Sequence, residues 1–168
     1  MKKYLYMSFL FIICLGSFQA CKNSEQKQDH GSVTPSSTAS TNPQSSHFET
    51  IKQLPIISPD SIFALYSQAD YLDFLFTSLP VSINASEPSS VRTHMQSFDT
   101  NPFFPEPCDN IGRMFIYSKG QQLTEADIYT NGLDCHYFVF YDGSIPTHIS
   151  GMTNTGKVFF KSILDRYR

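Results

Sequence analysis

Apolar and polar positions divide the chain into three stretches of different character. Residues 4–15 are almost uninterruptedly apolar, residues 22–47 are almost entirely polar, and apolar positions recur with a regular period from residue 48 onward. The polar stretch is rich in Ser, Thr, Asn, Gln and Pro, so it cannot bury enough surface to offset the entropy of ordering. Only the last stretch, of about 120 residues, has the pattern and length of a folded domain with a single core.

Two helices are predicted near the ends of this domain. The first begins at Ser58-Pro59-Asp60, where a capping serine, a proline at the first helical position and an acid in the first turn occur together. Apolar residues then recur at helical spacing, which predicts a helix over residues 59–77. A second apolar stripe at helical spacing predicts a helix over residues 153–167.

Strands are predicted between the two helices. Residues 79–109 contain several prolines and are expected to be mostly irregular. The four segments that follow have strand-like composition and are separated by turn sequences such as Lys119-Gly120 and Asp142-Gly143; they cover residues 113–118, 125–130, 135–141 and 144–149. We therefore expect an α+β fold: an N-terminal helix, a Pro-rich irregular segment, a four-stranded antiparallel β-meander and a C-terminal helix.

One face of this meander is the candidate binding surface. Successive side chains of a strand point to opposite faces, so Phe138 and Phe140 lie on one face and Tyr137 and Tyr141 on the other. An aromatic sheet face is suited to binding a sugar, a peptide or a protein. The alternative is that a helix or the Pro-rich segment covers this face. The candidate residues are Phe115, Tyr117, Tyr129, Tyr137 and Tyr141.

The first 21 residues suggest export. Lys2 and Lys3 precede the apolar stretch, which is too short for a comfortable transmembrane helix and has the length of a signal-peptide core. Ala20 precedes Cys21, and a polar run follows directly. This arrangement resembles the lipobox of bacterial lipoproteins, in which the cysteine is acylated and becomes the first residue of the mature chain. Plain secretion and an uncleaved short anchor are the alternatives.

The resemblance implies a domain organisation and a location. Residues 1–20 are expected to be a signal peptide, residues 21–47 a lipidated cysteine and a disordered tether, and residues 48–168 a single α+β domain. Its partners would be the membrane, through the lipid on Cys21, and an envelope protein or glycan. The expected order of elements also loosely resembles small envelope lipoproteins with a helix-plus-meander domain, such as the BamE-like ones. The choice between inner and outer membrane stays open.

The cysteines and the charge narrow the picture further. Cys108 and Cys135 are the two thiols of the domain, and in an exported protein such a pair predicts a disulfide; a metal-ligand or redox pair is the alternative. The domain has 13 acidic and 8 basic residues, a net charge of −5, and contains no basic run. Nucleic-acid binding therefore lacks its electrostatic basis.

No catalytic motif decides the function. The domain, residues 48–168, contains neither a GxSxG nor an SxxK sequence, and its histidines lack the spacing of common zinc sites. We expect no cofactor and no metal. The first hypothesis is a non-enzymatic binding or scaffolding module. The alternative is a small hydrolase or metal-dependent enzyme that uses His136, His148 and a carboxylate.

Overall fold

The computed structural model describes residues 43–167. The predictions for the signal peptide, for Cys21 and for the tether up to residue 42 lie outside this range. The described residues form four helices and seven strands, in the order α1 (Pro43–Ile51), α2 (Pro59–Gln68), β1 (Tyr71–Phe76), β2 (Ser82–Ala85), α3 (Pro88–Met95), β3 (Phe98–Asp99), β4 (Asn110–Ser118), β5 (Gln121–Thr130), β6 (His136–Asp142), β7 (Ile145–Met152) and α4 (Asn154–Tyr167).

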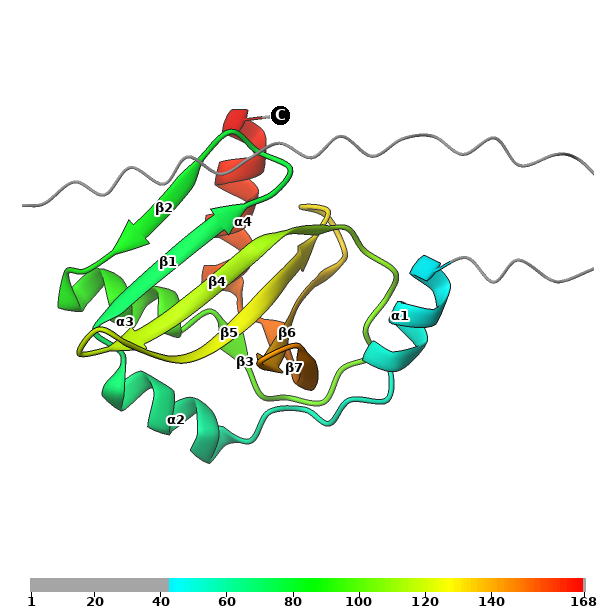
Figure 1. The fold of residues 1–168 in the computed structure, drawn as a ribbon. Coiled ribbons are helices and arrows are strands. Elements are labelled where there is room, and N and C mark those ends of the chain that lie inside the picture. Colours follow the sequence, from blue (N-terminus) through cyan, green and yellow to red (C-terminus); the bar gives the residue numbers. More distant parts are fainter. Residues whose placement is uncertain (1–42, 168) are drawn as a thin grey trace, which may run out of the picture. The chain divides into compact units, whose positions relative to one another are not determined.

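All seven strands belong to one antiparallel sheet. The strand order is β2-β1-β4-β5-β6-β7-β3, so β2 and the two-residue β3 form the edges. The sheet curls into a half-barrel around the helices, as Figure 1 shows. This curl brings the Phe98 ring of edge strand β3 to 4.8 Å from the Phe138 ring of β6, although β7 lies between the two strands.

The prediction of a four-stranded meander is therefore wrong. The predicted strands correspond to β4–β7, and β1, β2 and β3 extend the sheet at both sides. The N-terminal helix was predicted too long: α2 ends at Gln68, and Tyr71–Phe76 form β1. Leu72, Phe74 and Phe76 of β1 are buried and alternate with residues that face the other side. The spacing of these three residues also fits a continuing helix, which explains the error, and α1 was not predicted.

The local sequence explains where several elements begin. The Ser58 side chain accepts a hydrogen bond from the Ser61 backbone N–H at 3.1 Å and caps α2, as expected. Lys119 and Gly120 both adopt positive φ angles between β4 and β5, the conformation that a tight two-residue hairpin turn requires. The turn is one of the local features that the sequence predicted correctly.

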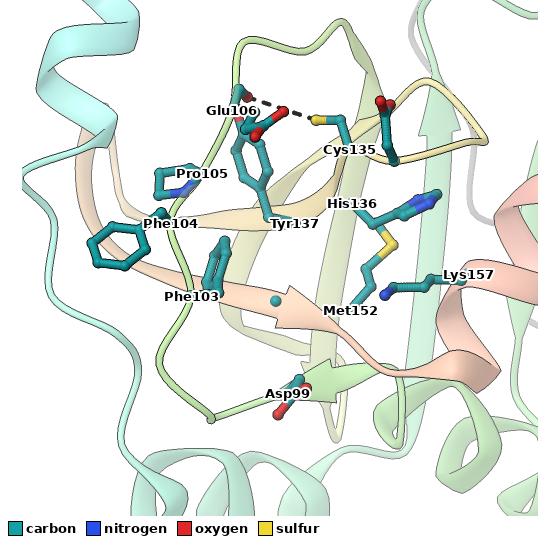
Figure 2. Close-up of a pocket in the computed structure, with 12 residues that line it drawn as sticks. Asp99, Phe103, Phe104, Pro105, Glu106, Cys135, His136, Tyr137, Met152 and Lys157 are labelled. Carbon is teal, nitrogen blue, oxygen red and sulfur yellow. Dashed lines mark hydrogen bonds between the residues drawn. The ribbon is translucent and has the colours of Figure 1, made fainter.

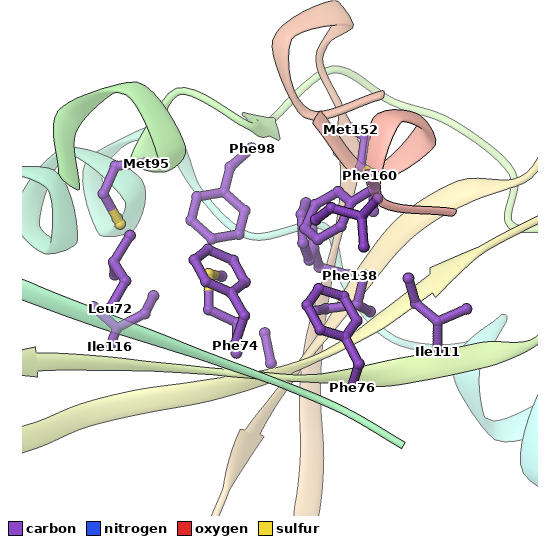
Figure 3. Packing of buried hydrophobic residues seen from close by; sticks show 14 of the residues in the cluster. Leu72, Phe74, Phe76, Met95, Phe98, Ile111, Ile116, Phe138, Met152 and Phe160 are labelled. Atoms are coloured by element: carbon purple, nitrogen blue, oxygen red, sulfur yellow. The ribbon is translucent and has the colours of Figure 1, made fainter. Parts of the chain in front are cut away.

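The main hydrophobic core lies on one face of the sheet, beneath α2, α3 and α4. It is rich in phenylalanine: the Phe160 ring of α4 contacts Phe74, Phe76 and Phe138, with ring centroids 5.9–6.4 Å apart. Figure 3 shows these side chains between the strands and the helices. Burying each such ring stabilises the fold by about 1.5–3 kcal/mol. All three of these helices thus cover the Phe138 face.

The opposite face carries a second, smaller cluster. It consists of Ile51, Tyr129, Cys135, Tyr137, Val139, Tyr141 and Ile149. Its cover comes from α1, from the residues that follow α1, and from residues 100–109, which we call the strap. The predicted alternation of β6 is confirmed, because Phe138 and Phe140 belong to the main core and Tyr137 and Tyr141 to this cluster.

Candidate functional site

The site lies on the face that carries Tyr129, Tyr137 and Tyr141, which we call the tyrosine face. Antiparallel pairing fixes how these side chains meet. Tyr129 of β5 lies directly opposite Tyr137 of β6, and Glu125 lies opposite Tyr141. On the other side of β5, Arg113 of β4 pairs with Asp127. Three neighbouring strands therefore bring aromatic and charged side chains together.

The strap crosses this face. It leaves β3 at one edge of the sheet and reaches β4, four strand positions away. That distance is roughly 19 Å at the usual strand spacing, and ten extended residues reach up to about 33 Å. Phe103 of the strap packs near Tyr137, with ring centroids 6.2 Å apart. Pro102, Pro105 and Pro107 favour the extended backbone that such a crossing needs.

A disulfide fastens the end of the strap to the sheet. Cys108 is bonded to Cys135, with a Cα–Cα distance of 6.0 Å, which confirms the predicted pair. Cys135 directly precedes β6. The bond therefore holds the strap beside Tyr137, at the centre of the tyrosine face.

Helix α1 forms the third wall of the site. Its Ile51 side chain is 1 % exposed and packs into the smaller cluster. The Nε2 atom of His47 lies 3.0 Å from the Tyr129 hydroxyl and forms a hydrogen bond with it. One apolar anchor and one polar contact therefore position α1 over the tyrosines.

An open cavity of about 1070 Å³ lies between these three walls. Residues from α1, from the end of the strap and from β5 and β6 surround it, so residues distant in sequence form one site. The lining residues are His47, Phe48, Glu49, Ile51, Ser78, Pro107, Cys108, Asp109, Asn110, Asp127, Tyr129, Asn131, Tyr137 and Tyr141. We call this space the tyrosine cavity. Its volume is sufficient for a small organic ligand.

Of the carboxylates that line the tyrosine cavity, two have a cationic partner in the described part of the chain and one does not. Three carboxylates line it and no Lys or Arg does. Asp127 is 6 % exposed and bonds to Arg113 Nε at 2.6 Å. Glu49 pairs with Lys52 on the exposed surface of α1 at 3.1 Å. Within residues 43–167, the Asp109 carboxylate has no ion-pair partner.

Arg113 forms a small network at the border of the cavity. Its guanidinium group contacts Asp127 and Glu125, each at 2.6 Å, and lies 4.7 Å from the centre of the Tyr141 ring. The hydrogen bond with Asp127 raises the pKa of Arg113 further above its usual value. Burial, reinforced by the Asp127 charge, raises the pKa of Tyr141. This face therefore already binds one planar cation, supplied by the chain itself.

The Tyr137 hydroxyl has no hydrogen-bond partner. Its side chain is 1 % exposed, and it is the one buried side-chain polar group in the described part of the chain that lacks a bond. Burial raises the pKa of Tyr137, with a smaller effect from Tyr129. Native proteins rarely leave such a group unsatisfied, because its desolvation costs about 1–3 kcal/mol.

Two of the five predicted residues lie elsewhere on the tyrosine face. Phe115 and Tyr117 are on the part of β4 that pairs with β1, and both are half-buried. The Tyr117 ring packs against Tyr71 of β1, with centroids 5.7 Å apart. The structure therefore brings Tyr129, Tyr137 and Tyr141 together and leaves Phe115 and Tyr117 on an adjoining surface.

A second, smaller cavity of about 250 Å³ lies on the other side of the strap. Figure 2 shows the Phe103 and Tyr137 rings beside it and His136 near Lys157. Phe104 of the strap points into solvent and is 95 % exposed. Because Tyr137 lines both cavities, the strap divides the tyrosine face into two compartments.

The histidines proposed for catalysis do not meet. His148 of β7 pairs with Phe140, four residues along β6 from His136, or about 13 Å. The His136 ring is engaged locally, with Nδ1 2.8 Å from the Thr130 hydroxyl and Nε2 3.0 Å from the Leu133 carbonyl oxygen. Within residues 43–167, no three His, Cys, Asp or Glu side chains are arranged to hold a metal ion.

Sequence reasoning missed two functional groups of the cavity. His47 and Glu49 belong to α1, in or next to the stretch expected to be a tether, and they join Asp109 of the irregular segment in the lining. No local motif marks these residues. Only the path of the strap and the packing of α1 bring them to the tyrosines.

The chain matches no family model, no curated protein and no solved structure. None of the helices within residues 43–167 is long and apolar enough to cross a membrane. The function is therefore argued from the geometry of the tyrosine cavity.

Proposed function

We propose that the protein is a non-catalytic binding module of the bacterial cell envelope that takes a small ligand into the tyrosine cavity. The observation that carries this proposal is the convergence of three buried or nearly buried tyrosines from β5 and β6 beneath α1 and the strap. Helices α2, α3 and α4 pack on the opposite face, and α1 and the strap, which cover the tyrosine face, leave the tyrosine cavity open between them.

The groups in the cavity favour binding over catalysis. Aromatic walls with a few polar groups are typical of small-molecule sites. His47 is the one histidine in the lining, and it contacts a tyrosine hydroxyl, not a serine or cysteine nucleophile. His136 and His148, proposed for the enzyme alternative, lie outside the lining of the cavity.

The proposed location rests on the N-terminal sequence. The apolar stretch ends at Ala20-Cys21 in a pattern that resembles a lipobox. Two or more acyl chains on Cys21 would anchor the chain firmly. The disulfide between Cys108 and Cys135 is compatible with an oxidising compartment outside the cytosol.

Retention of small molecules tests the binding proposal. The full chain is incubated with a small-molecule extract of bacterial envelopes, filtered and analysed by mass spectrometry. The variant Ser78→Trp places a large side chain in the cavity, and Ser162→Trp makes the same change on the exposed surface of α4. We expect wild type and Ser162→Trp to retain the same compound and Ser78→Trp to lose it, with all three melting cooperatively. Equal retention by the three proteins, or none, would refute the proposal.

A further inference from the structure

The chemistry of the tyrosine cavity indicates the class of its ligand, and this step rests on the function proposed above. We infer that the cavity binds a small organic cation that carries one positive charge and N–H donors, such as a primary amine or a guanidine. Three features of the lining support this: the exposed Asp109 carboxylate, which has no ion-pair partner among the described residues, the unpartnered buried hydroxyl of Tyr137, and the presence of three tyrosines.

The charge of the lining favours a positively charged ligand. Two of the three lining carboxylates, Asp127 and Glu49, already have cationic partners, Arg113 and Lys52. Asp109 has none within the described residues. An anion would meet three carboxylates and no Lys or Arg side chain in the lining. A ligand with a single positive charge would compensate Asp109 and leave the existing ion pairs in place.

The Tyr137 hydroxyl is the reason to expect N–H donors on the ligand. Tyr137 lines the cavity, and its hydroxyl is buried and has no partner among the described residues. A ligand N–H donor can give the Tyr137 oxygen the hydrogen bond that it lacks, since a tyrosine hydroxyl both donates and accepts. A quaternary ammonium group carries the charge without such a donor. The two kinds of cation therefore separate the contribution of Tyr137 from that of Asp109.

The tyrosine rings are a third reason to expect a cationic ligand. The Arg113 guanidinium already lies over the Tyr141 ring and between two carboxylates, so this surface is demonstrably suited to a cation. Cations bind favourably over tyrosine faces, more so where water is excluded. Tyr129 and Tyr137, whose rings are stacked on each other, also line the cavity.

Four probes that share a phenyl ring test the inference: benzylamine, benzyl alcohol, benzoate and benzyltrimethylammonium. Isothermal titration calorimetry with the full chain at pH 7.5 and low salt measures each dissociation constant. We expect benzylamine to bind at least fivefold more tightly than benzyl alcohol, and benzoate to bind least. Raising the salt concentration should reduce this preference, because charges near the surface are screened.

Two variants assign the effect to residues. Asp109→Asn should bring benzylamine binding to the level of benzyl alcohol, and Asp142→Asn, the same change at an exposed hairpin outside the lining, should leave it unchanged. Tyr137→Phe should weaken benzylamine at least threefold and leave benzyltrimethylammonium unaffected.

The inference would be overturned by any of four results: the amine and the alcohol bind equally, benzoate binds more tightly than benzylamine, Asp109→Asn has no effect, or no probe binds. The proposed function is decided separately by the retention experiment. A neutral or anionic compound that is retained by wild type and lost by Ser78→Trp would leave the binding function standing and refute only the cationic ligand.

Discussion

The rings of Tyr129 and Tyr137 stack across β5 and β6, with their centroids 4.8 Å apart and their planes inclined by 7°. The two hydroxyls differ in their surroundings. That of Tyr129 bonds to His47, whereas that of Tyr137 is buried without a partner. The same strand pair therefore holds one tyrosine whose hydroxyl is hydrogen-bonded and one whose hydroxyl is not, and the two can be compared directly.

Removing the Tyr137 hydroxyl should stabilise the ligand-free protein. Tyr137→Phe removes a buried oxygen that has lost its hydration without gaining a hydrogen bond. We therefore expect the free energy of unfolding to rise by about 1 kcal/mol. Tyr129→Phe is the matched control: it loses the bond to His47 and should be destabilised by about 1 kcal/mol. Urea unfolding measures both. A loss of stability in Tyr137→Phe as large as that in Tyr129→Phe would contradict this interpretation.

Breaking the disulfide should destabilise the domain markedly. Cys108 and Cys135 are 27 residues apart, and a loop of this length corresponds to about 3–4 kcal/mol in the chain-entropy model. We expect the double variant Cys108→Ser/Cys135→Ser to lose that amount in urea unfolding. Wild type with and without a reducing agent provides the control. Identical midpoints for the reduced and oxidised proteins would show that the bond contributes nothing.

Arg113 and Asp127 should be strongly coupled. In Arg113→Gln the nearly buried Asp127 carboxylate loses its charged partner, and we expect a loss of about 2 kcal/mol, since bonds to charged groups contribute about 1.5–3 kcal/mol. Adding Asp127→Asn removes the unpaired charge and should recover part of the loss. A double-mutant cycle from urea unfolding measures the coupling. Strictly additive effects of the two substitutions would contradict it.

His94 should make stability depend on pH. Its ring lies 4.4 Å from that of Phe159 and 5.2 Å from that of Phe74, and burial lowers its pKa. The unfolded chain therefore binds the proton more readily, so stability is complete above pH 6.5, the ordinary histidine pKa, and falls as pH decreases toward the lowered value. Each unit of pKa difference corresponds to at most about 1.4 kcal/mol.

The variant His94→Phe keeps a ring in the aromatic cluster and removes the titrating group. We expect it to lose less stability than wild type between pH 7.5 and pH 5.5 in urea unfolding. All other residues are identical in the two proteins, so the difference between them isolates the contribution of His94. An equal loss in the two proteins would show that His94 is not responsible.

The lipid anchor can be tested in cells. Replacing Cys21 with Ala removes the thiol that would be acylated, so we expect an unprocessed precursor without label from a fatty-acid probe. Cys14→Ala, within the apolar stretch, is the matched control and should be labelled and processed like wild type. Correctly cleaved, soluble protein from Cys21→Ala would sink the proposed anchor.

The sequence predicted the local features of the fold better than the long-range ones. Turn residues and alternation identified β4–β7 and the two faces of β6, because both signals lie within a few neighbouring residues. The spacing of apolar residues after Leu65 fits a helix as well as a strand, so the sequence predicted β1 as a continuation of α2. The two-residue strand β3 is too short to leave any pattern.

The same reasoning explains what was predicted of the candidate site. Tyr129, Tyr137 and Tyr141 were named because strand alternation assigns them to one face. His47 and Asp109 reach that face only through tertiary packing, which no local periodicity records. The cavity therefore became visible only once the strap and α1 were placed on the sheet.

The path of the strap also sets an order of assembly. Residues 100–109 precede β4–β7 in the chain but lie across strands that are made later, and β3 pairs with β7, the last strand of all. During synthesis from the N-terminus, the strap emerges before the strands that it crosses, so it cannot pack on the sheet until the final hairpin has formed. Cys108 likewise waits for Cys135. The strap and its disulfide can therefore reach their final positions only after the hairpins of β4–β7 have formed.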